Sequence, residues 1–211
     1  MKKKSLVEKV WAAVWIAKAG KPPPCGVRVK GAVPKLKPWA ERRLKIGDQE
    51  GIKGWQKTLS KDEKDAIRNW SDTDYWYVRA IDKGETPRSM RISKVHDTLK
   101  SIITNAPKVK GTVYRGLTNL SLGDLKRVTM VGNEFKLKAV ASFTEDFNVA
   151  AQYAKHAKAS NGIILRVKTK SAVDIRGLTK IKSEKELLID KGHRYKITKV
   201  EDMVAWLKEI E

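Results

Sequence analysis

The sequence predicts an α+β fold, with helices first and mostly antiparallel strands after them. Between residues 60 and 106, apolar side chains recur at the three- and four-residue spacing of helices. After Pro107 they alternate with the period of two that is typical of strands. The sequence has no Gly-rich phosphate loop and no dinucleotide fingerprint. These observations favour an α+β domain over one built of alternating βαβ units.

Three helices are expected before Pro107. Ser60-Lys-Asp-Glu63 is a capping-box sequence, which predicts the start of a helix that carries Trp70 among its apolar residues. Ser71-Asp-Thr-Asp74 predicts that a second helix starts there and ends at Gly84. A third helix, over residues 88–106, has one continuous apolar face.

Strands dominate the second half of the chain. The expected strands span residues 111–117, 134–142, 162–168, 185–190 and 193–200. One helix is expected among them, over residues 148–159, and residues 201–210 favour a closing helix. Asp190-Lys-Gly192 is interpreted as a hairpin turn between the last two strands.

Charge divides the chain into two parts. Its 45 Lys and Arg residues and 24 Asp and Glu residues give a formal net charge of +21. Residues 1–54 hold 14 basic and 4 acidic side chains, and we interpret them as a basic helix followed by a Pro-, Gly- and Lys-rich arm. Residues 55–211 form the expected folded domain. A field of this sign attracts polyanions, so nucleic acid is the first partner to consider. A solvated surface and an acidic partner protein are the alternatives.

Two features bear on the compartment. The start of the chain has a basic head and a short apolar stretch interrupted by charges, which favours an amphipathic helix over a signal peptide. The single cysteine, Cys25, excludes an internal disulfide and fits a reducing compartment. No run approaches the roughly 18 apolar residues of a membrane span. We therefore expect a cytoplasmic protein, in the producing cell or in a target cell.

Polar side chains at the ends of predicted strands are the candidates for chemistry. They are Arg115 in "VYRG", Ser142 and Thr144 in "ASFTED", and Glu184 and Glu186 in "SEKELLI". In a strand, residues two apart face the same side, so Glu184 and Glu186 are expected to point together. Neighbouring carboxylates repel unless they serve a cation, a metal or a reaction centre. Each feature alone also fits an ordinary surface residue or turn.

In this order, the motifs resemble those of the mono-ADP-ribosyltransferases of the Arg–Ser–Glu class, which include many bacterial toxins and phage modification enzymes. The resemblance runs from about Leu59 to Val200. "VYRG" matches the arginine motif, "VASFT" the strand motif usually written Phe-x-Ser-Thr-Ser, and "SEKELLIDKGHRYKI" the Glu-x-Glu motif and the strand and hairpin after it. The resemblance implies a fold with leading helices and a mostly antiparallel two-sheet β core around an NAD cleft. It also implies NAD⁺ as co-substrate and no metal.

The resemblance also implies roles for the matched residues. Arg115 would anchor the pyrophosphate of NAD⁺, and Gly116 would let the backbone approach the nicotinamide amide. Ser142 would orient Glu186, which would hold the ribose and stabilise its developing positive charge. Glu184 would position or deprotonate the acceptor.

Some positions depart from the family pattern or leave alternatives open. Phe143 and Thr144 replace the second and third residues of Ser-Thr-Ser; Phe143 would pack in the core or lean on the nicotinamide, and Thr144 would support the strand end. Tyr75 or Tyr77 would stack on the adenosine or pack in the core. The three histidines, His96, His156 and His193, sit singly and lack metal-site spacing.

The acceptor is a separate question. In this family a Glu-x-Glu pair usually accompanies arginine as acceptor, whereas the charge of +21 and the tryptophans of the basic arm favour nucleic acid, either RNA or DNA. We expect a nucleic-acid acceptor, with a protein arginine as the alternative. A non-catalytic nucleic-acid-binding protein and an NAD⁺ glycohydrolase are further alternatives. A toxin or phage-conflict role, with an acidic neutralising partner, follows from the resemblance.

Overall fold

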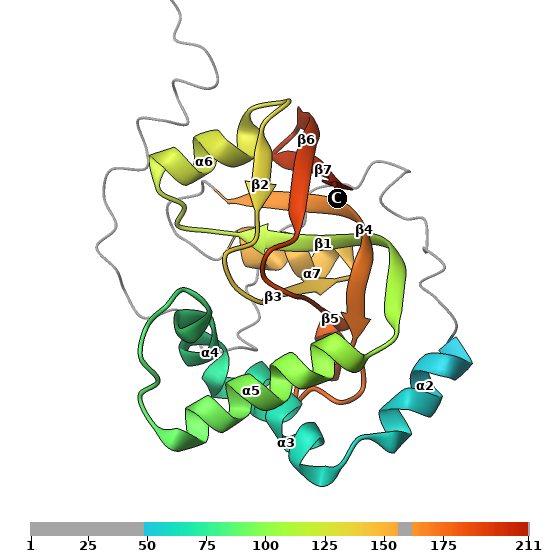
Figure 1. The fold of residues 1–211 in the computed structure, drawn as a ribbon. Coiled ribbons are helices and arrows are strands. Elements are labelled where there is room, and N and C mark those ends of the chain that lie inside the picture. Colours follow the sequence, from blue (N-terminus) through green and yellow to red (C-terminus); the bar gives the residue numbers. More distant parts are fainter. Residues whose placement is uncertain (1–48, 156–161, 211) are drawn as a thin grey trace, which may run out of the picture.

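The computed structural model describes residues 49–155 and 162–210 (Figure 1). The expected N-terminal helix and Pro-rich arm lie outside the described residues up to position 48. Helix α2 (Gln49–Thr58) crosses the expected boundary between residues 54 and 55. Its Ile52 side chain is buried in the largest apolar cluster, which includes Leu165 and Leu187 and is called the main core below. This helix therefore packs with the folded domain.

Helix α3 (Lys61–Asn69) begins at the expected capping box. The hydroxyl of Ser60 accepts a hydrogen bond from the Glu63 backbone N–H at 3.2 Å, and the Glu63 carboxylate accepts one from the Ser60 N–H at 2.8 Å. These reciprocal bonds pair backbone donors that a helix start would otherwise leave unsatisfied. The predicted start is confirmed.

The expected second helix start after Ser71 is wrong. The chain stays helical through a π-turn (Trp70–Asp74, η2) and continues as helix α4 (Tyr75–Asp82). Asp74 has helical backbone angles, φ −89° and ψ −10°, and makes no capping hydrogen bond, although an N-cap needs extended backbone. Its carboxylate instead accepts two hydrogen bonds, at 2.6 and 2.9 Å, from Arg91 of helix α5 (Met90–Asn105), which is the expected third helix.

Seven strands in the described residues form one sheet. They are β1 (Lys108–Leu117), β2 (Glu134–Lys136), β3 (Ala141–Thr144), β4 (Ile163–Asp174), β5 (Glu186–Ile189), β6 (Arg194–Glu201) and β7 (Val204–Ile210). Their order is β1-β3-β5-β4-β7-β6-β2, and β1 also pairs with β4, so that β1, β3, β5 and β4 close on one another. Pairings in this part of the chain are antiparallel except that of β4 with β7. The α+β class is confirmed, with the strands joined in one sheet.

Residues 134–142 form two strands where the sequence indicated one. After β2, Leu137 exchanges backbone hydrogen bonds with the turn before β6, accepting from Gly192 at 2.8 Å and donating to His193 at 3.0 Å. Val140 then donates its backbone N–H to the buried Asp82 carboxylate at 2.8 Å. Because β2 pairs with β6 whereas β3 pairs with β1 and β5, the chain has to change neighbours between them.

The end of the chain also differs from prediction. A turn follows Asp190, and Gly192 has φ +92°, but β5 and β6 pair with different strands and form no hairpin. Residues 204–210 are strand β7 instead of a helix, because they lie between β4 and β6 and pair with both. The actual hairpin joins β6 to β7 through Asp202 and Met203, whose φ values are +48° and +64°.

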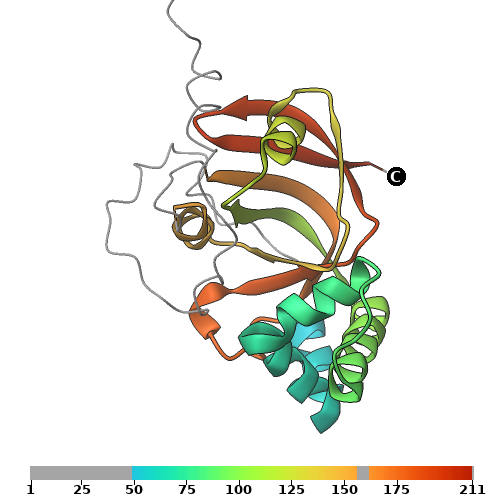
Figure 2. The same ribbon diagram turned by 90° about the vertical axis from the view of Figure 1, so that its left-hand side faces the viewer.

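Two helices pack on opposite faces of the sheet. Helix α6 (Leu122–Thr129), which the sequence did not indicate to us, buries Leu125 and Val128 in the main core. Helix α7 (Phe147–Ala154) corresponds to the helix expected over 148–159 and starts one residue earlier. Residues 156–159 of the expected helix lie outside the described part. It packs on Ile164 and Val204, on the other face. Figure 2 shows α7 to the left of the strands.

The helices α3–α5 form a layer of their own below the strands (Figures 1 and 2). Their apolar residues, with Trp70 among them, share a core with Val140, Val173 and Leu188 of the sheet side. This core places Trp70 of the π-turn beside Val140, just before β3, and beside Leu188 of β5. Among the described residues, no helix is long and apolar enough to span a bilayer.

Candidate functional site

Glu186 is the centre of the candidate site. It is the first residue of β5, and only 5% of its surface is exposed. Its Oε1 accepts two hydrogen bonds, one from Trp70 Nε1 at 2.9 Å and one from the Ser142 hydroxyl. Its buried Oε2 has no hydrogen-bond partner among the described residues. A buried carboxylate oxygen without a partner is costly, and such an atom is explained if a ligand donates to it.

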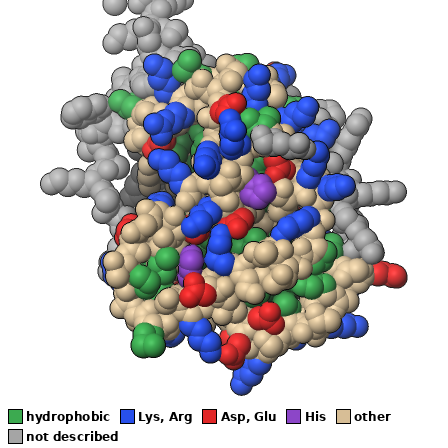
Figure 3. Space-filling view, viewed as in Figure 1, with side chains coloured by type: hydrophobic (Ala, Val, Ile, Leu, Met, Phe, Trp, Pro, Cys, Tyr) green, Lys and Arg blue, Asp and Glu red, His purple; other side chains and the backbone are tan. Residues whose placement is uncertain are grey.

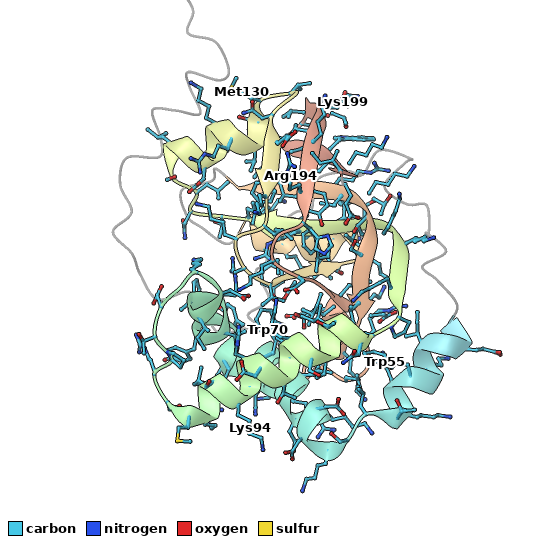
Figure 4. All side chains as sticks on the ribbon, in the orientation of Figure 1. Trp55, Trp70, Lys94, Met130, Arg194 and Lys199 are labelled. Atoms are coloured by element: carbon cyan, nitrogen blue, oxygen red, sulfur yellow. The ribbon has the colours of Figure 1, made fainter. Side chains whose placement is uncertain are left out.

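Two different elements deliver the donors to Glu186. Ser142 lies in β3, which pairs with β5 in the register Thr144 opposite Glu186 and Ser142 opposite Leu188. Trp70 lies at the start of the π-turn, and π-turns are frequent at functional sites. Figure 4 shows Trp70 in the helical layer at its border with the strands. The predicted contact of Ser142 with Glu186 is present, whereas we had interpreted Trp70 as a helix residue without a role in the site.

Burial dominates the protonation of Glu186. Desolvation raises its pKa, and the donors Ser142 and Trp70 act in the opposite direction because they stabilise the ionised form. The neighbouring charge of Glu184 raises the pKa of Glu186 further, while that of Arg115 lowers it. The net result is a carboxyl group with a pKa above its usual value.

Glu184 reaches the site by a route that differs from the expected one. It ends a 3-10 turn (Lys182–Glu184, η3), and Lys185 after it adopts the left-handed conformation, φ 48° and ψ 51°. A turn therefore brings Glu184 near Glu186, and strand alternation does not. The Glu184 carboxylate accepts a hydrogen bond from the Tyr153 hydroxyl of α7 at 2.5 Å. Burial raises the pKa of Glu184, and this hydrogen bond opposes the rise.

Arg115 places a positive charge beside Glu186, and Arg79 lies close enough to Arg115 to affect its pKa. Arg115 of β1 donates from Nη1 to the backbone carbonyl of Ser142 at 2.6 Å, and its guanidinium lies 5.8 Å from the centre of the Phe143 ring. Burial, then the charge of Arg79, lower the pKa of Arg115 to about 9, so it stays charged at neutral pH. Burial also lowers the pKa of Arg79 on α4, and its buried Nε has no hydrogen-bond partner in the described part of the chain.

Two neighbouring guanidinium groups, one of which lowers the pKa of the other, form a candidate anion site. Arginine donors in a planar fork match phosphate oxygens, and a diphosphate would neutralise both groups at once. The role of Arg115 as the phosphate anchor stays a prediction, and Arg79 is a candidate partner that we did not predict. The sequence shows Arg79 only as a basic residue on the predicted second helix, and its position in the sequence does not relate it to Arg115.

Three further predicted site residues have clear structural positions. A Cβ on Gly116 would lie 2.1 Å from the backbone oxygen of Ala150, so α7 packs directly on this glycine. Phe143 is buried in the main core, which agrees with the first of its two expected positions. The Thr144 hydroxyl accepts a hydrogen bond from the Asp146 backbone N–H at 3.0 Å, and so supports the strand end. The contacts of these residues with NAD⁺ stay predictions.

The two tyrosines of α4 lie differently. Tyr75 is partly buried, and its ring meets that of Trp70 edge-on with 6.4 Å between centres. The same residue favours the charged forms of Arg79 and Arg115, which places it near the anion site. Tyr77 carries Arg88 over its ring at 4.9 Å. Tyr75 is therefore the better candidate for contact with the adenosine.

Metal chemistry has no candidate ligands in this part of the chain. Within residues 49–155 and 162–210, no group of three His, Cys, Asp or Glu residues could hold a metal ion. His96 contacts Asp82 and Asp97, and His193 contacts Glu209. His156 lies outside the described residues.

The solved structures of three bacterial proteins are similar to this chain. The Vis toxin, an ADP-ribosyltransferase from Vibrio splendidus, has 22% sequence identity, covers 77% of this chain and 82% of its own, and superposes with a TM-score of 0.60. The type III effector XopAI from Xanthomonas axonopodis pv. citri has 15% identity, 75% and 73% coverage, and a TM-score of 0.56. The Clostridium limosum C3 exoenzyme has 15% identity, 77% and 94% coverage, and a TM-score of 0.54. These likenesses establish the fold.

Comparison at the level of sequence families is more specific. Among curated proteins, no sequence matches this chain. The family model described as ADP-ribosyltransferase exoenzyme matches residues 47–209, which include every element of the described structure that contributes to the site. The chain therefore belongs to the ADP-ribosyltransferase exoenzyme family and is an NAD⁺-dependent ADP-ribosyltransferase.

Proposed function

We propose that this enzyme transfers ADP-ribose from NAD⁺ to nucleic acid. The observation that carries the choice of acceptor is the positive charge of +21, much of it on the folded domain. On the face shown in Figure 3, Lys and Arg side chains gather over the strands in the upper half, whereas acidic side chains are more frequent over the helices below. A surface of this kind attracts a phosphodiester chain.

The site residues divide the reaction among them. Arg115 and Arg79 hold the diphosphate of NAD⁺ and fix the position of the nicotinamide-side ribose. The Oε2 atom of Glu186 accepts a hydrogen bond from a hydroxyl of that ribose. When the bond between ribose and nicotinamide breaks, its electron pair leaves with nicotinamide, and the Glu186 carboxylate stabilises the positive charge that develops on the sugar.

Glu184 acts on the acceptor side of the same centre. Its raised pKa makes it a base that can take the proton of the attacking hydroxyl or amino group, while Tyr153 holds the carboxylate in place. The new bond joins the acceptor to the ribose carbon that nicotinamide leaves. Without an acceptor, water takes that position and the reaction becomes hydrolysis of NAD⁺.

A protein arginine is the second candidate acceptor. The observation in its favour is the Glu184–Glu186 pair itself, since a carboxylate beside the reacting carbon can bind a guanidinium group. The similar Vis ADP-ribosyltransferase has been solved in complex with agmatine, a compound that carries such a group. Against this candidate, an arginine acceptor gains little from a strongly positive surface.

The test incubates purified protein and labelled NAD⁺ with total RNA, total DNA and total protein in separate reactions. We expect label in nucleic acid, absent with Glu186→Gln, and strongly reduced with Glu184→Gln, which should still hydrolyse NAD⁺. Label confined to protein would refute the nucleic-acid acceptor and favour arginine. Hydrolysis that no macromolecule accelerates would identify a glycohydrolase, and no turnover of NAD⁺ at all would leave only the non-catalytic binding protein.

We also propose a role in conflict between cells or between phage and host, inside the cytoplasm of the producing or target cell. Modification of nucleic acid harms a cell unless it is restrained, and an acidic neutralising partner would match the charge of this chain. Expression of wild-type protein should therefore arrest bacterial growth, whereas Glu186→Gln should not. Equal growth of the two strains at equal protein levels would overturn this role.

A further inference from the structure

Three exposed lysines lie side by side across the sheet. Lys168 of β4 is directly opposite Lys208 of β7, and Lys208 is directly opposite Lys196 of β6. All three side chains are exposed, and none of them forms an ion pair with a carboxylate in the part of the chain that the structure describes. We call these three residues the lysine row.

The lysine row is an unfavourable arrangement for the folded protein alone. Like charges directly opposite each other on neighbouring strands destabilise a sheet, and adjacent strands are only about 4.8 Å apart. The next residue in the row is Glu134 of β2, opposite Lys196, and its carboxylate is engaged by Arg194. An anion bound from outside would remove this repulsion.

The adjacent row across the same strands adds two cations around a tryptophan. Arg166 of β4 and Lys199 of β6 both pair with Trp206 of β7. The guanidinium carbon of Arg166 is 4.1 Å, and Nζ of Lys199 5.4 Å, from the centre of the Trp206 ring. Such cation–π contacts keep both charges close to the sheet surface, although Lys199 also forms an ion pair with Glu201 at 2.7 Å. Lys199 is labelled near one end of β6 in Figure 4.

This face of the sheet is the one on which α7 lies. Trp206 packs at the edge of the cluster that α7 forms with Ile164 and Val204. The same helix carries Tyr153, whose hydroxyl bonds Glu184 on the acceptor side of the site. Helix α7 therefore contacts both the row that contains Trp206 and Glu184 on the acceptor side of the site.

We propose that the lysine row and the Arg166–Trp206–Lys199 row form a docking surface for the phosphodiester backbone of a single-stranded nucleic acid. The proposal rests on the nucleic-acid acceptor proposed above. Lysine binds phosphate as a point charge, and contacts of this kind position a strand without reading its sequence. Protein interfaces are instead depleted in Lys and have an apolar centre, and here the half-buried Trp206 is the one large apolar side chain of the two described rows. The chemistry therefore favours a nucleic acid over an acidic protein.

The test measures binding of labelled single-stranded RNA and DNA of equal length to the full chain, by fluorescence anisotropy over a range of salt concentrations and without NAD⁺. The row variant is Lys168→Gln, Lys196→Gln and Lys208→Gln together. A matched control, Lys53→Gln, Lys57→Gln and Lys61→Gln, removes three exposed lysines of α2 and α3 and the same total charge.

Loss of three phosphate contacts should make the negative salt slope, d log K/d log[salt], shallower by about 2 and weaken binding by about a hundredfold near 0.1 M salt. The control should keep the wild-type slope, and both variants should keep the wild-type rate of NAD⁺ hydrolysis and melting temperature. Comparison of RNA with DNA shows which strand the surface takes. Equal loss in the row variant and the control would overturn the proposal, because total charge would then explain binding.

Two further results separate this surface from the acceptor. If poly-L-glutamate of matched charge binds as tightly as RNA through the lysine row, the surface belongs to an acidic protein and the proposal is wrong. If label from NAD⁺ enters RNA equally well with wild type and row variant, the docking surface fails while the acceptor stands. If label enters only protein although the row variant has lost RNA binding, the acceptor fails and the docking surface stands.

Discussion

Two glutamates, the buried Glu186 in β5 and the half-buried Glu209 in β7, show how surroundings decide the use of one side chain. Glu186 accepts hydrogen bonds on Oε1 alone. Glu209 accepts on both oxygens; its donors are the Thr169 hydroxyl, the Lys170 backbone N–H, the Ser171 hydroxyl and the His193 ring. Burial raises the pKa of each, but the donors of Glu209 outweigh burial and lower its pKa to about 2.

The contrast separates a group that holds the fold together from one kept for a ligand. Glu209, near the end of β7, joins the middle of β4 to the start of β6, and each of its oxygens has a donor. Glu186 has one oxygen to offer and a carboxylate that the fold itself does not fully stabilise. Buried ionisable groups that remain under-satisfied occur where chemistry needs them, and the substitutions below test this distinction.

The largest effect is expected for Glu186→Gln. The amide keeps an acceptor for Trp70 and Ser142 but removes the negative charge, so hydrolysis of NAD⁺ should fall by about 10²–10³-fold. The melting temperature should stay equal or rise, because the neutral side chain needs no desolvation of a charge. Initial rates and thermal melts measure both. A destabilised but active variant would mean that Glu186 serves the fold.

Glu209→Gln should show the reverse pattern. The amide nitrogen of Gln would face backbone and hydroxyl donors, so several charge-assisted hydrogen bonds are lost and stability falls by about 2–3 kcal/mol. The melting temperature should drop by roughly 4–12 °C, as differential scanning calorimetry would show. NAD⁺ hydrolysis measured well below the melting point should match wild type. A loss of activity in a fully folded sample would contradict the structural role.

Trp70→Phe removes one of the two donors to Glu186 and keeps an aromatic ring in the core. We expect a loss in kcat of about tenfold, corresponding to about 1.4 kcal/mol for one hydrogen bond to a charged group. The acid limb of the pH–rate profile should move to higher pH, because the pKa of Glu186 rises further. Trp76→Phe, at a side chain that is 45% exposed, is the control. An unchanged acid limb would show that Trp70 only packs.

The smallest effect is in the pH dependence of stability, where the two glutamates have opposite signs. The folded pKa of Glu209 is lowered, so its stabilisation is present above the unfolded value near 4.5 and is lost as the pH falls toward about 2. Wild type should therefore be more stable than Glu209→Gln at neutral pH, and the gap should close over this window.

For Glu186 the folded pKa is raised, so the cost of its buried charge is present at neutral pH and disappears as the pH falls through that raised value. Wild type should be no more stable than Glu186→Gln at neutral pH and should gain on it in acid. Melting temperatures of the three proteins between pH 7 and pH 3 provide the measurement. Gaps that change in the same direction for both variants would break the comparison.

Sequence reasoning succeeded for elements that local chemistry determines. The capping box at Ser60 and the apolar face of α5 are written in neighbouring residues, and both helices form as expected. It failed for β7, because a segment with acceptable helical spacing becomes a strand when β4 and β6 offer it backbone partners on both sides. The helix start predicted at residues 71–74 is also wrong: the Asp74 carboxylate accepts hydrogen bonds from Arg91 and makes none to the backbone of a helix start.

The site was predictable to the extent that it consists of motifs. Arg115, Ser142 and Glu186 were identified from short patterns, and the structure brings them together. Trp70 lies 116 residues before Glu186, and no pattern links a helix tryptophan to a carboxylate at that separation. The position of Glu184 depends on the left-handed backbone of Lys185, a conformation that the identity of a lysine does not indicate.

The π-turn makes the length of its helix matter as much as its composition. A π-turn accommodates one residue more than a regular helix would, and each residue of an α-helix rotates the chain by about 100°. Deleting one residue between Trp70 and Tyr75 would return the turn to regular helix with the flanking residues nearly in phase. Inserting a further residue would instead rotate Trp70, the donor to Glu186, by about 100° relative to Arg79, the neighbour of Arg115. A further insertion in this turn is therefore expected to separate the two halves of the site.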